Sequence, residues 1–226
     1  MKLASIPPTR GTKPLLLVLA TLLGTVACDG FAWAGDVYSK DVRSFLEIRR
    51  KNVVIQEWDL SCGAASLATI LRYQHGEQVS EREIAEAMLR AAGEDLVRRR
   101  LGFSLLDLKR YLQSRGYVGD GYAELTLGDV LDLAPAIVPV RLFTYDHFVI
   151  FRGVEAGRVV LADSAYGVRT MDVRRFLAIW EKRVAFVVRR PSMPPAPNLL
   201  ALPDEDLLVV SPQMVRATLP PLGGWL

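Results

Sequence analysis

The stretch from Gln56 to Leu71 constrains this chain most, because it passes from an extended polar segment into a helix at its cysteine. After the cysteine, small and apolar residues recur at helical spacing, at Ala64, Leu67, Ala68 and Leu71. Cys62 then lies in the first turn, where unpaired backbone N–H groups and the helix dipole favour an anion. The amide of Gln56, six residues upstream, can donate to a developing oxyanion at the same place. The stretch therefore predicts a thiol nucleophile, although a lone cysteine also commonly packs as a small hydrophobic residue.

The first 34 residues predict export. Three basic residues come before an apolar run at 15–27, which is shorter than the roughly 20 residues of a membrane-spanning helix. Such a run is typical of a secretory signal, and Ala32-Trp33-Ala34 predicts cleavage after Ala34, which places the mature chain in the periplasm. The alternative is a lipoprotein signal, with Thr25-Val26-Ala27 before a lipidated Cys28. Only this alternative attaches the protein to a membrane.

Removal of residues 1–34 leaves 192 residues, enough for one domain, with 25 basic and 24 acidic side chains. A net charge of +1 gives no reason to expect nucleic acid as a partner. Cys62 becomes the only cysteine, so no internal disulfide can form, and no C-x-x-C pair or other metal-binding pattern is present. We therefore expect neither a metal nor another cofactor. A free thiol is a liability in an oxidising compartment, which favours a chemical role for it.

The middle of the chain reads as scaffold. Turn and capping signals predict a lead-in helix or strand at 37–51, a short strand at 53–55 and another strand at 137–140. They also predict four helices. The first runs from Cys62 to Gly76, the second starts at Ser80 with its capping-box partner Glu83, the third runs from Ser104 to Gly116, and the fourth spans 127–133. Between two of these helices, the basic run Arg98-Arg99-Arg100 is interpreted as solvated loop.

Of the two histidines, only one can reach the thiol. His75 is thirteen residues further along the cysteine helix, about 20 Å away, and we expect it to be exposed at the helix end. His147 begins an apolar strand at 147–152, and residues 158–162 read as the returning strand. The link Glu155-Ala156-Gly157 suits a three-residue hairpin loop.

This hairpin brings a carboxylate to His147. The register places Asp163 opposite Val149 and diagonal to His147, about 7–8 Å away at the backbone, which lets the side chains meet. Asp146 is the weaker candidate, because adjacent strand residues point to opposite faces. The prediction is an activated thiol with Cys62 as nucleophile, His147 as base and then acid, and Asp163 as the group that orients the imidazole.

The segments 56–71, 146–150 and 160–163 together resemble the bacteriocin-processing, double-glycine leader peptidase family of papain-like cysteine peptidases. The resemblance extends over about residues 50–190 and places the family's nucleophile, histidine, aspartate and oxyanion-hole glutamine on Cys62, His147, Asp163 and Gln56. Many members have Asp before the cysteine, where this chain has Ser61, and Pro after the aspartate, where it has Ser164.

The resemblance implies an α+β, papain-like fold in which the nucleophile helix packs on an antiparallel sheet that carries the histidine and the aspartate. No second apolar span and no phosphate-binding Gly-x-x-x-x-Gly-Lys loop accompanies it, so the chain is similar to the stand-alone exported members, including those that accompany secretion of functional amyloid. We expect domain limits of 35–190, followed by a proline-rich tail at 191–226 that ends with Gly223-Gly224 before the last two residues.

The expected function is hydrolysis of a peptide bond in an exported polypeptide, in the service of a secretion system with inner- or outer-membrane components. One alternative is a non-catalytic chaperone or scaffold that holds an extended export substrate in the same cleft. A second alternative keeps the thiol chemistry and makes the substrate the cell wall, as in an amidase.

Overall fold

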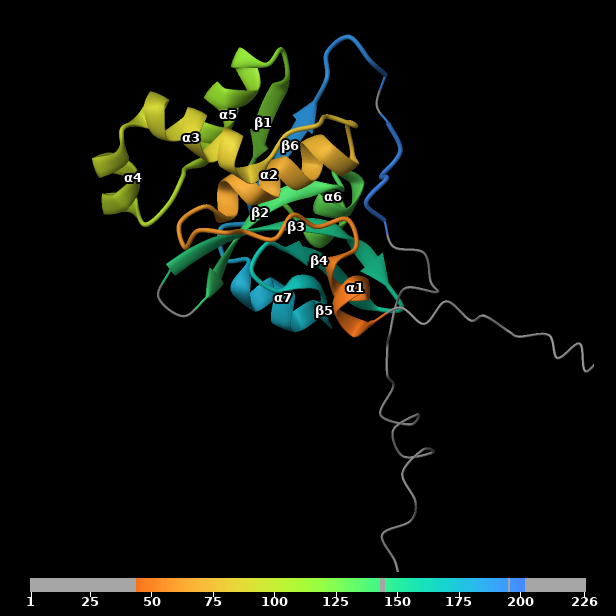
Figure 1. Ribbon diagram of the computed structural model, residues 1–226. Helices are drawn as coiled ribbons and strands as arrows, with labels where there is room; N and C mark the ends of the chain where they lie inside the picture. Colours follow the sequence, from red (N-terminus) through yellow and green to blue (C-terminus); the bar gives the residue numbers. More distant parts are fainter. Residues whose placement is uncertain (1–43, 143–144, 195, 202–226) are drawn as a thin grey trace, which may run out of the picture. The chain divides into compact units, whose positions relative to one another are not determined.

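In a computed structural model, the chain forms one antiparallel sheet with the strand order β1-β6-β2-β3-β4-β5 (Figure 1). The structure describes residues 44–142, 145–194 and 196–201. The predicted signal, Cys28 and Gly223-Gly224 lie outside these residues. Within them, the strands are β1 (Val118–Tyr122), β2 (Ala136–Leu142), β3 (Tyr145–Glu155), β4 (Arg158–Asp163), β5 (Gly167–Asp172) and β6 (Ala185–Arg189).

Helices cover both faces of this sheet. Those in the described residues are α1 (Phe45–Arg50), α2 (Cys62–Tyr73), α3 (Glu81–Ala92), α4 (Glu94–Arg100), α5 (Leu105–Ser114), α6 (Leu127–Asp132) and α7 (Val173–Ile179). The predicted starts at Ser80 and Ser104 are confirmed, since each serine accepts a backbone N–H of the first turn and forms a full capping box. Figure 1 shows α2, α3, α4 and α5 on one side of the sheet and α7 on the other.

Alternation along the strands explains the two layers of core. On β2, Ile137 packs in the cluster formed with α2, α3 and α5, whereas Val138 and Val140 pack in the cluster formed with α6 and α7. Buried on both faces, the strand is apolar nearly throughout, as expected for a central strand. The expected α+β fold, with the cysteine helix packed on an antiparallel sheet, is confirmed.

Three local predictions are wrong. Residues 53–55 form no strand, because the Val54 N–H donates to Thr69 Oγ1 (2.9 Å) rather than to a neighbouring strand. The basic run at 98–100 is the last turn of α4, supported by an i,i+4 contact from Arg98 Nε to Glu94 (2.9 Å). The hairpin loop has two residues instead of three, since Glu155 pairs with Arg158.

The chain beyond β6 returns to the domain. Leu200 is fully buried in the core cluster of α2 and α3, and its carbonyl oxygen accepts a hydrogen bond from Arg152 Nε. Gln74 of the α2 C-cap donates to the Pro197 carbonyl (2.7 Å) and accepts the Leu199 N–H (2.9 Å). This part of the proline-rich segment is therefore held by the domain through both apolar and polar contacts.

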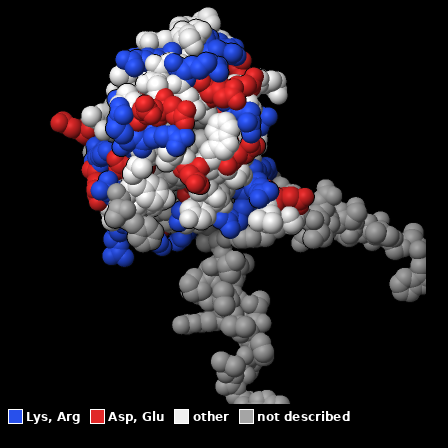
Figure 2. Space-filling model, turned by 60° about the vertical axis from the view of Figure 1, so that its left-hand side comes forward, with Lys and Arg blue, Asp and Glu red and all other residues white. Residues whose placement is uncertain are grey.

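The surface mixes both signs of charge. Figure 2 shows Lys and Arg interspersed with Asp and Glu on the face it presents. Among the described residues, no helix combines the length and the hydropathy needed to cross a membrane.

Candidate active site

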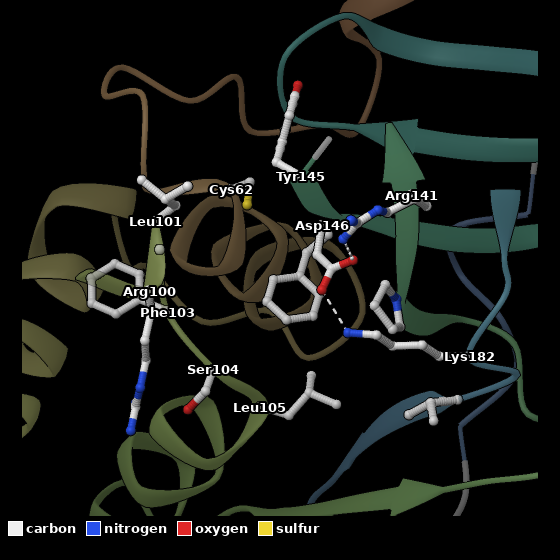
Figure 3. Close-up of a pocket in the computed structure, with 14 residues that line it drawn as sticks. Cys62, Arg100, Leu101, Phe103, Ser104, Leu105, Arg141, Tyr145, Asp146 and Lys182 are labelled. Carbon is white, nitrogen blue, oxygen red and sulfur yellow. Dashed lines mark hydrogen bonds and ion pairs between the residues drawn. The ribbon is translucent and has the colours of Figure 1, made fainter. Parts of the chain in front are cut away.

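Cys62 is the first residue of α2, as the sequence predicts. Cys62 is 9% exposed and lines a pocket (Figure 3), whereas residues 64, 65, 67 and 68 behind it on the helix are fully buried. Gly63 brings the helix close to its neighbours, because a Cβ at this position would lie 3.3 Å from Phe148 and 3.2 Å from Leu108. The nucleophile candidate is therefore accessible from one side only.

His147 and Asp163 form the predicted pair. His147 Nε2 donates to Asp163 Oδ1 at 2.9 Å, and Val149 pairs with Asp163 in the sheet as expected. With Nε2 committed to the carboxylate, Nδ1 is the ring nitrogen left for the thiol of Cys62, whose proximity helps to raise the pKa of His147. The chain thus brings residues 62, 147 and 163 together. Asp146 instead pairs with Arg141 (3.2 Å) and Lys182 (2.5 Å).

The partners of the imidazole decide its charge. Burial lowers the pKa of His147, but hydrogen bonds and charges from Asp163 and Cys62 outweigh burial and raise this pKa to about 9. Burial likewise opposes ionisation of Asp163, yet the His147 contact, the Ala165 N–H and the Arg169 guanidinium hold the pKa of this carboxyl below its ordinary value. The arrangement therefore favours an imidazolium beside an ionised carboxylate at neutral pH.

Gln56 is held at both ends of its amide. Its Oε1 accepts the Ser164 hydroxyl at 2.8 Å, and its Nε2 donates to the Trp58 carbonyl at 3.0 Å. The backbone also links Gln56 N–H to Ser164 O at 2.9 Å, so Gln56 is tied to the residue that follows Asp163. An amide NH₂ has two hydrogens, so one is left for a substrate oxygen.

A cavity of about 430 Å³ lies beside Cys62. Figure 3 shows Leu101 and Phe103, from the connection between α4 and α5, on one wall, and the Asp146 ion pairs on another. Leu101 is 65% exposed, so its apolar side chain is open to a molecule that enters the cavity. The cavity can thus accept an apolar side chain next to a charged rim.

Sequence reasoning missed two groups that support the site. Arg169 on β5 donates to Asp163 Oδ2 at 3.0 Å, and Glu81 at the start of α3 binds the loop before Cys62. Neither carries a local signal, because only tertiary packing shows what these charged residues contact. His75 is half-buried rather than exposed, with its ring edge-on to Tyr117, so that expectation is wrong.

No group of three or more His, Cys, Asp or Glu side chains within the described residues is arranged to hold a metal ion. The acidic and histidine groups of the site are instead satisfied by each other and by Arg169.

Comparison with known proteins agrees with this geometry. Residues 50–192 match the Peptidase C39 family. A probable functional amyloid protease FapD of Pseudomonas fluorescens is 40% identical over 174 residues, which is 76% of each chain. A protein of the same description from Pseudomonas aeruginosa is 36% identical over 175 residues, 77% of this chain and 76% of that one.

Two solved structures share the fold. One is a double glycine motif protease from an AMS/PCAT transporter in complex with a leader peptide (21% identity, TM-score 0.50, 61% of this chain and 90% of that one). The other is the peptidase domain of Streptococcus ComA (23% identity, TM-score 0.50, 61% of this chain and 96% of that one).

The fold and the family match together define a papain-like cysteine peptidase. More specifically, the chain belongs to the Peptidase C39 family, and the resemblance to double-glycine leader peptidases inferred from its residues is confirmed.

Proposed function

We propose that this cysteine peptidase is exported to the periplasm and cuts a polypeptide of a functional amyloid secretion system. The description of its two Pseudomonas relatives as functional amyloid proteases supports the system. The N-terminal signal pattern supports the compartment. The double glycine motif protease that shares the fold supports a substrate with glycines before the cleaved bond.

Four side chains carry the proposed reaction. The Cys62 sulfur attacks the scissile carbonyl carbon, and the resulting oxyanion is bound by the free Nε2 hydrogen of Gln56 and by the Cys62 backbone N–H. His147, protonated and held by Asp163, gives its proton to the leaving nitrogen as the C–N bond breaks. The products of this step are a free amine and a thioester on Cys62.

Water completes the cycle. Neutral His147 takes a proton from water as its oxygen attacks the thioester carbonyl, and the C–S bond then breaks. The second peptide leaves as a carboxylic acid, and the thiolate–imidazolium pair is restored.

The observation that carries this proposal is the convergence of Cys62 at a helix start with a buried, hydrogen-bonded His147–Asp163 pair beside an open cavity. A thiol with such a partner at a pocket is what nucleophilic catalysis needs, and a structural cysteine needs neither.

A fluorogenic peptide with Gly-Gly before the cleaved bond tests the activity. Wild-type protein should cleave it, and Cys62→Ala should have no activity above background. The secretion-system proteins, incubated with each variant and analysed by mass spectrometry, should show a cleavage that requires Cys62. Cleavage by Cys62→Ala would contradict the proposal, and binding without cleavage by wild type would favour the chaperone alternative.

The compartment has a separate test. Mass spectrometry of the protein purified from periplasm should give an N-terminus at Gly35, after removal of residues 1–34. A lipid-modified N-terminus at Cys28 would favour the lipoprotein alternative instead, and recovery of the intact chain from the cytoplasm would contradict export.

A further inference from the structure

Glu81 is a buried carboxylate that helix capping does not require. It is the first residue of α3, but Ser80 and Glu83 already form the capping box of that helix. Its exposed fraction is 5%, whereas Arg82 and Glu83 of the same turn are exposed. The helix dipole favours a carboxylate at this position, but burial of its charge is costly unless the oxygens are hydrogen-bonded.

The partners of Glu81 are the two ends of the loop that leads to the nucleophile. Oε2 and Oε1 accept the Glu57 N–H at 2.9 and 3.1 Å. Oε1 also accepts the hydroxyl of Ser61. Glu57 directly follows Gln56 and Ser61 directly precedes Cys62, so one carboxylate holds the neighbours of both the amide donor and the thiol.

The loop between these ends is held by Trp58, which packs against the core, and by contacts with the first turn of α3. It contains no helix or strand, and the Trp58 carbonyl accepts both the Gln56 side chain (3.0 Å) and the Ser61 N–H (3.3 Å). Arg82, next to Glu81, stacks its guanidinium over the Trp58 ring at 4.8 Å. The first turn of α3 is therefore the support on which the loop rests.

The contact with Ser61 also changes the start of α2. A serine at an N-cap normally accepts a hydrogen bond from the second or third N–H of its helix. Ser61 is the N-cap of α2 and makes no such bond. Its hydroxyl instead contacts both Glu81 and the Trp58 carbonyl (2.7 Å), which ties the residue before Cys62 to α3 and to its own loop.

We propose that Glu81 is a positioning residue for the oxyanion-binding side of the active site. It fixes the loop that joins the Gln56 amide to Cys62, because it binds the residue after Gln56 and the residue before Cys62. The proposal rests on the proposed peptidase function of this site, and it assigns to Glu81 no contact with substrate.

The test compares three measurements on Glu81→Gln, in which an NH₂ group replaces one acceptor oxygen. Turnover of the Gly-Gly fluorogenic peptide should show a kcat lowered by about 10- to 100-fold, because small displacements of catalytic groups have effects of this size, and a KM within about twofold of wild type. Affinity for a peptidyl glycinal, whose carbonyl adds the Cys62 sulfur reversibly and presents an oxyanion, should fall by the same factor as kcat.

The third measurement separates positioning from general damage. Alkylation of Cys62 by iodoacetamide needs the thiolate but no oxyanion donors, so its rate should change by less than about twofold. A matched control is Glu83→Gln, which makes the same chemical change two residues away on the exposed side of the turn and should leave kcat unchanged. Wild-type kcat and glycinal affinity in Glu81→Gln, or an equal loss of alkylation rate, would overturn the proposal.

Ser61→Ala covers the case in which Glu81→Gln does not fold. It removes the same hydrogen bond from the other side, and it should lower kcat and glycinal affinity together with unchanged alkylation; wild-type values would overturn the proposal. Should wild-type protein cleave no peptide, the peptidase function fails, and the glycinal and alkylation measurements still decide the role of Glu81.

Discussion

The hydroxyl of Ser164 donates to Oε1 of Gln56 at 2.8 Å, which holds this end of the amide at the residue that follows Asp163. Rotation of the amide by 180° would set Oε1 against the Trp58 carbonyl, where neither oxygen can donate, so the Trp58 and Ser164 contacts together fix the amide in one orientation. Ser164 stands where many family members have proline, and it is almost fully buried. A side chain that directly follows Asp163 therefore helps to hold Gln56, the oxyanion donor that we propose.

Ser164→Ala should lower kcat about 2- to 10-fold, the value of one neutral hydrogen bond, with little change in KM. Because Ser164 acts through Gln56, the loss should vanish in a Gln56→Ala background, which by itself should cost about 10²–10³ in kcat. Steady-state kinetics of the two single variants and the double variant measure this coupling.

Ser66→Ala is the matched control for Ser164→Ala. Ser66 is equally buried and donates to the Phe148 carbonyl, but it has no contact with Gln56. The factor by which Ser66→Ala lowers kcat should be the same in the wild-type and Gln56→Ala backgrounds. A Ser164→Ala effect that persists in full without the Gln56 amide would show that Ser164 does not act through it.

The charge of His147 predicts an alkaline limit to activity. Its pKa of about 9 means that the imidazolium is present at neutral pH and is lost as the pH rises through 9. The kcat/KM profile should therefore fall near pH 9. Because the folded pKa lies above the ordinary value of 6.5, the stability that this group adds is complete below pH 6.5 and lost as the pH rises toward 9. Thermal unfolding across this range measures the second effect.

Asp163→Asn should move this limit. Burial is then opposed only by Cys62, so the pKa of His147 should fall, kcat/KM at pH 7.5 should drop at least about tenfold, and the alkaline limb of the pH profile should shift downward. Asp146→Asn is the control, because it makes the same chemical change at the residue next to His147. The alkaline limb of its kcat/KM profile should stay near pH 9, whatever happens to KM. If the alkaline limb shifted in Asp146→Asn and not in Asp163→Asn, Asp146 and not Asp163 would be the group that orients His147.

The sequence predicts those features that depend on local signals. Capping boxes mark the starts of α3 and α5, and the helical spacing after Cys62 marks α2. The pairing of Val149 with Asp163 is also confirmed, although the hairpin reaches it in a different way from the one predicted. The loop is one residue shorter than predicted, and a bulge at 152 between the pairs of Phe151 and Gly153 restores the register.

Features that depend on distant partners could not be predicted in this way. The apolar run at 53–55 has the composition of a strand, but its backbone is bound by Thr69 of α2, fifteen residues beyond Val54. Glu81 has the local pattern of an ordinary first-turn acid, and only its burial against Ser61 distinguishes it from Glu83. Arg169 is likewise one of many surface arginines until its contact with Asp163 is seen.

Leu101 predicts how the cavity binds substrate. It lines the cavity beside Cys62 and is 65% exposed, so in the free protein it contributes little to the free energy of unfolding. Leu101→Ala should raise KM for the Gly-Gly peptide about 3- to 10-fold, as expected for partial loss of apolar contact, and leave kcat and Tm nearly unchanged. Leu106→Ala is the control, since Leu106 is 51% exposed but does not line the cavity. Equal effects of the two changes on KM would exclude this cavity as the apolar subsite.

Leu200 and Leu199 provide a paired test of the segment that returns to the domain after β6. Leu200 is fully buried in the core, whereas the neighbouring Leu199 is 55% exposed. Leu200→Ala should lower the free energy of unfolding by about 2–5 kcal/mol through lost burial and the cavity left behind, and Leu199→Ala should change it by less than about 0.5 kcal/mol. Thermal unfolding of the two variants measures the difference, expected as a fall in Tm of about 4–20 °C for Leu200→Ala alone. A Tm for Leu200→Ala equal to that of Leu199→Ala would mean that the domain does not depend on this segment in solution, and that Arg152 and Gln74 bind it too weakly to matter for folding.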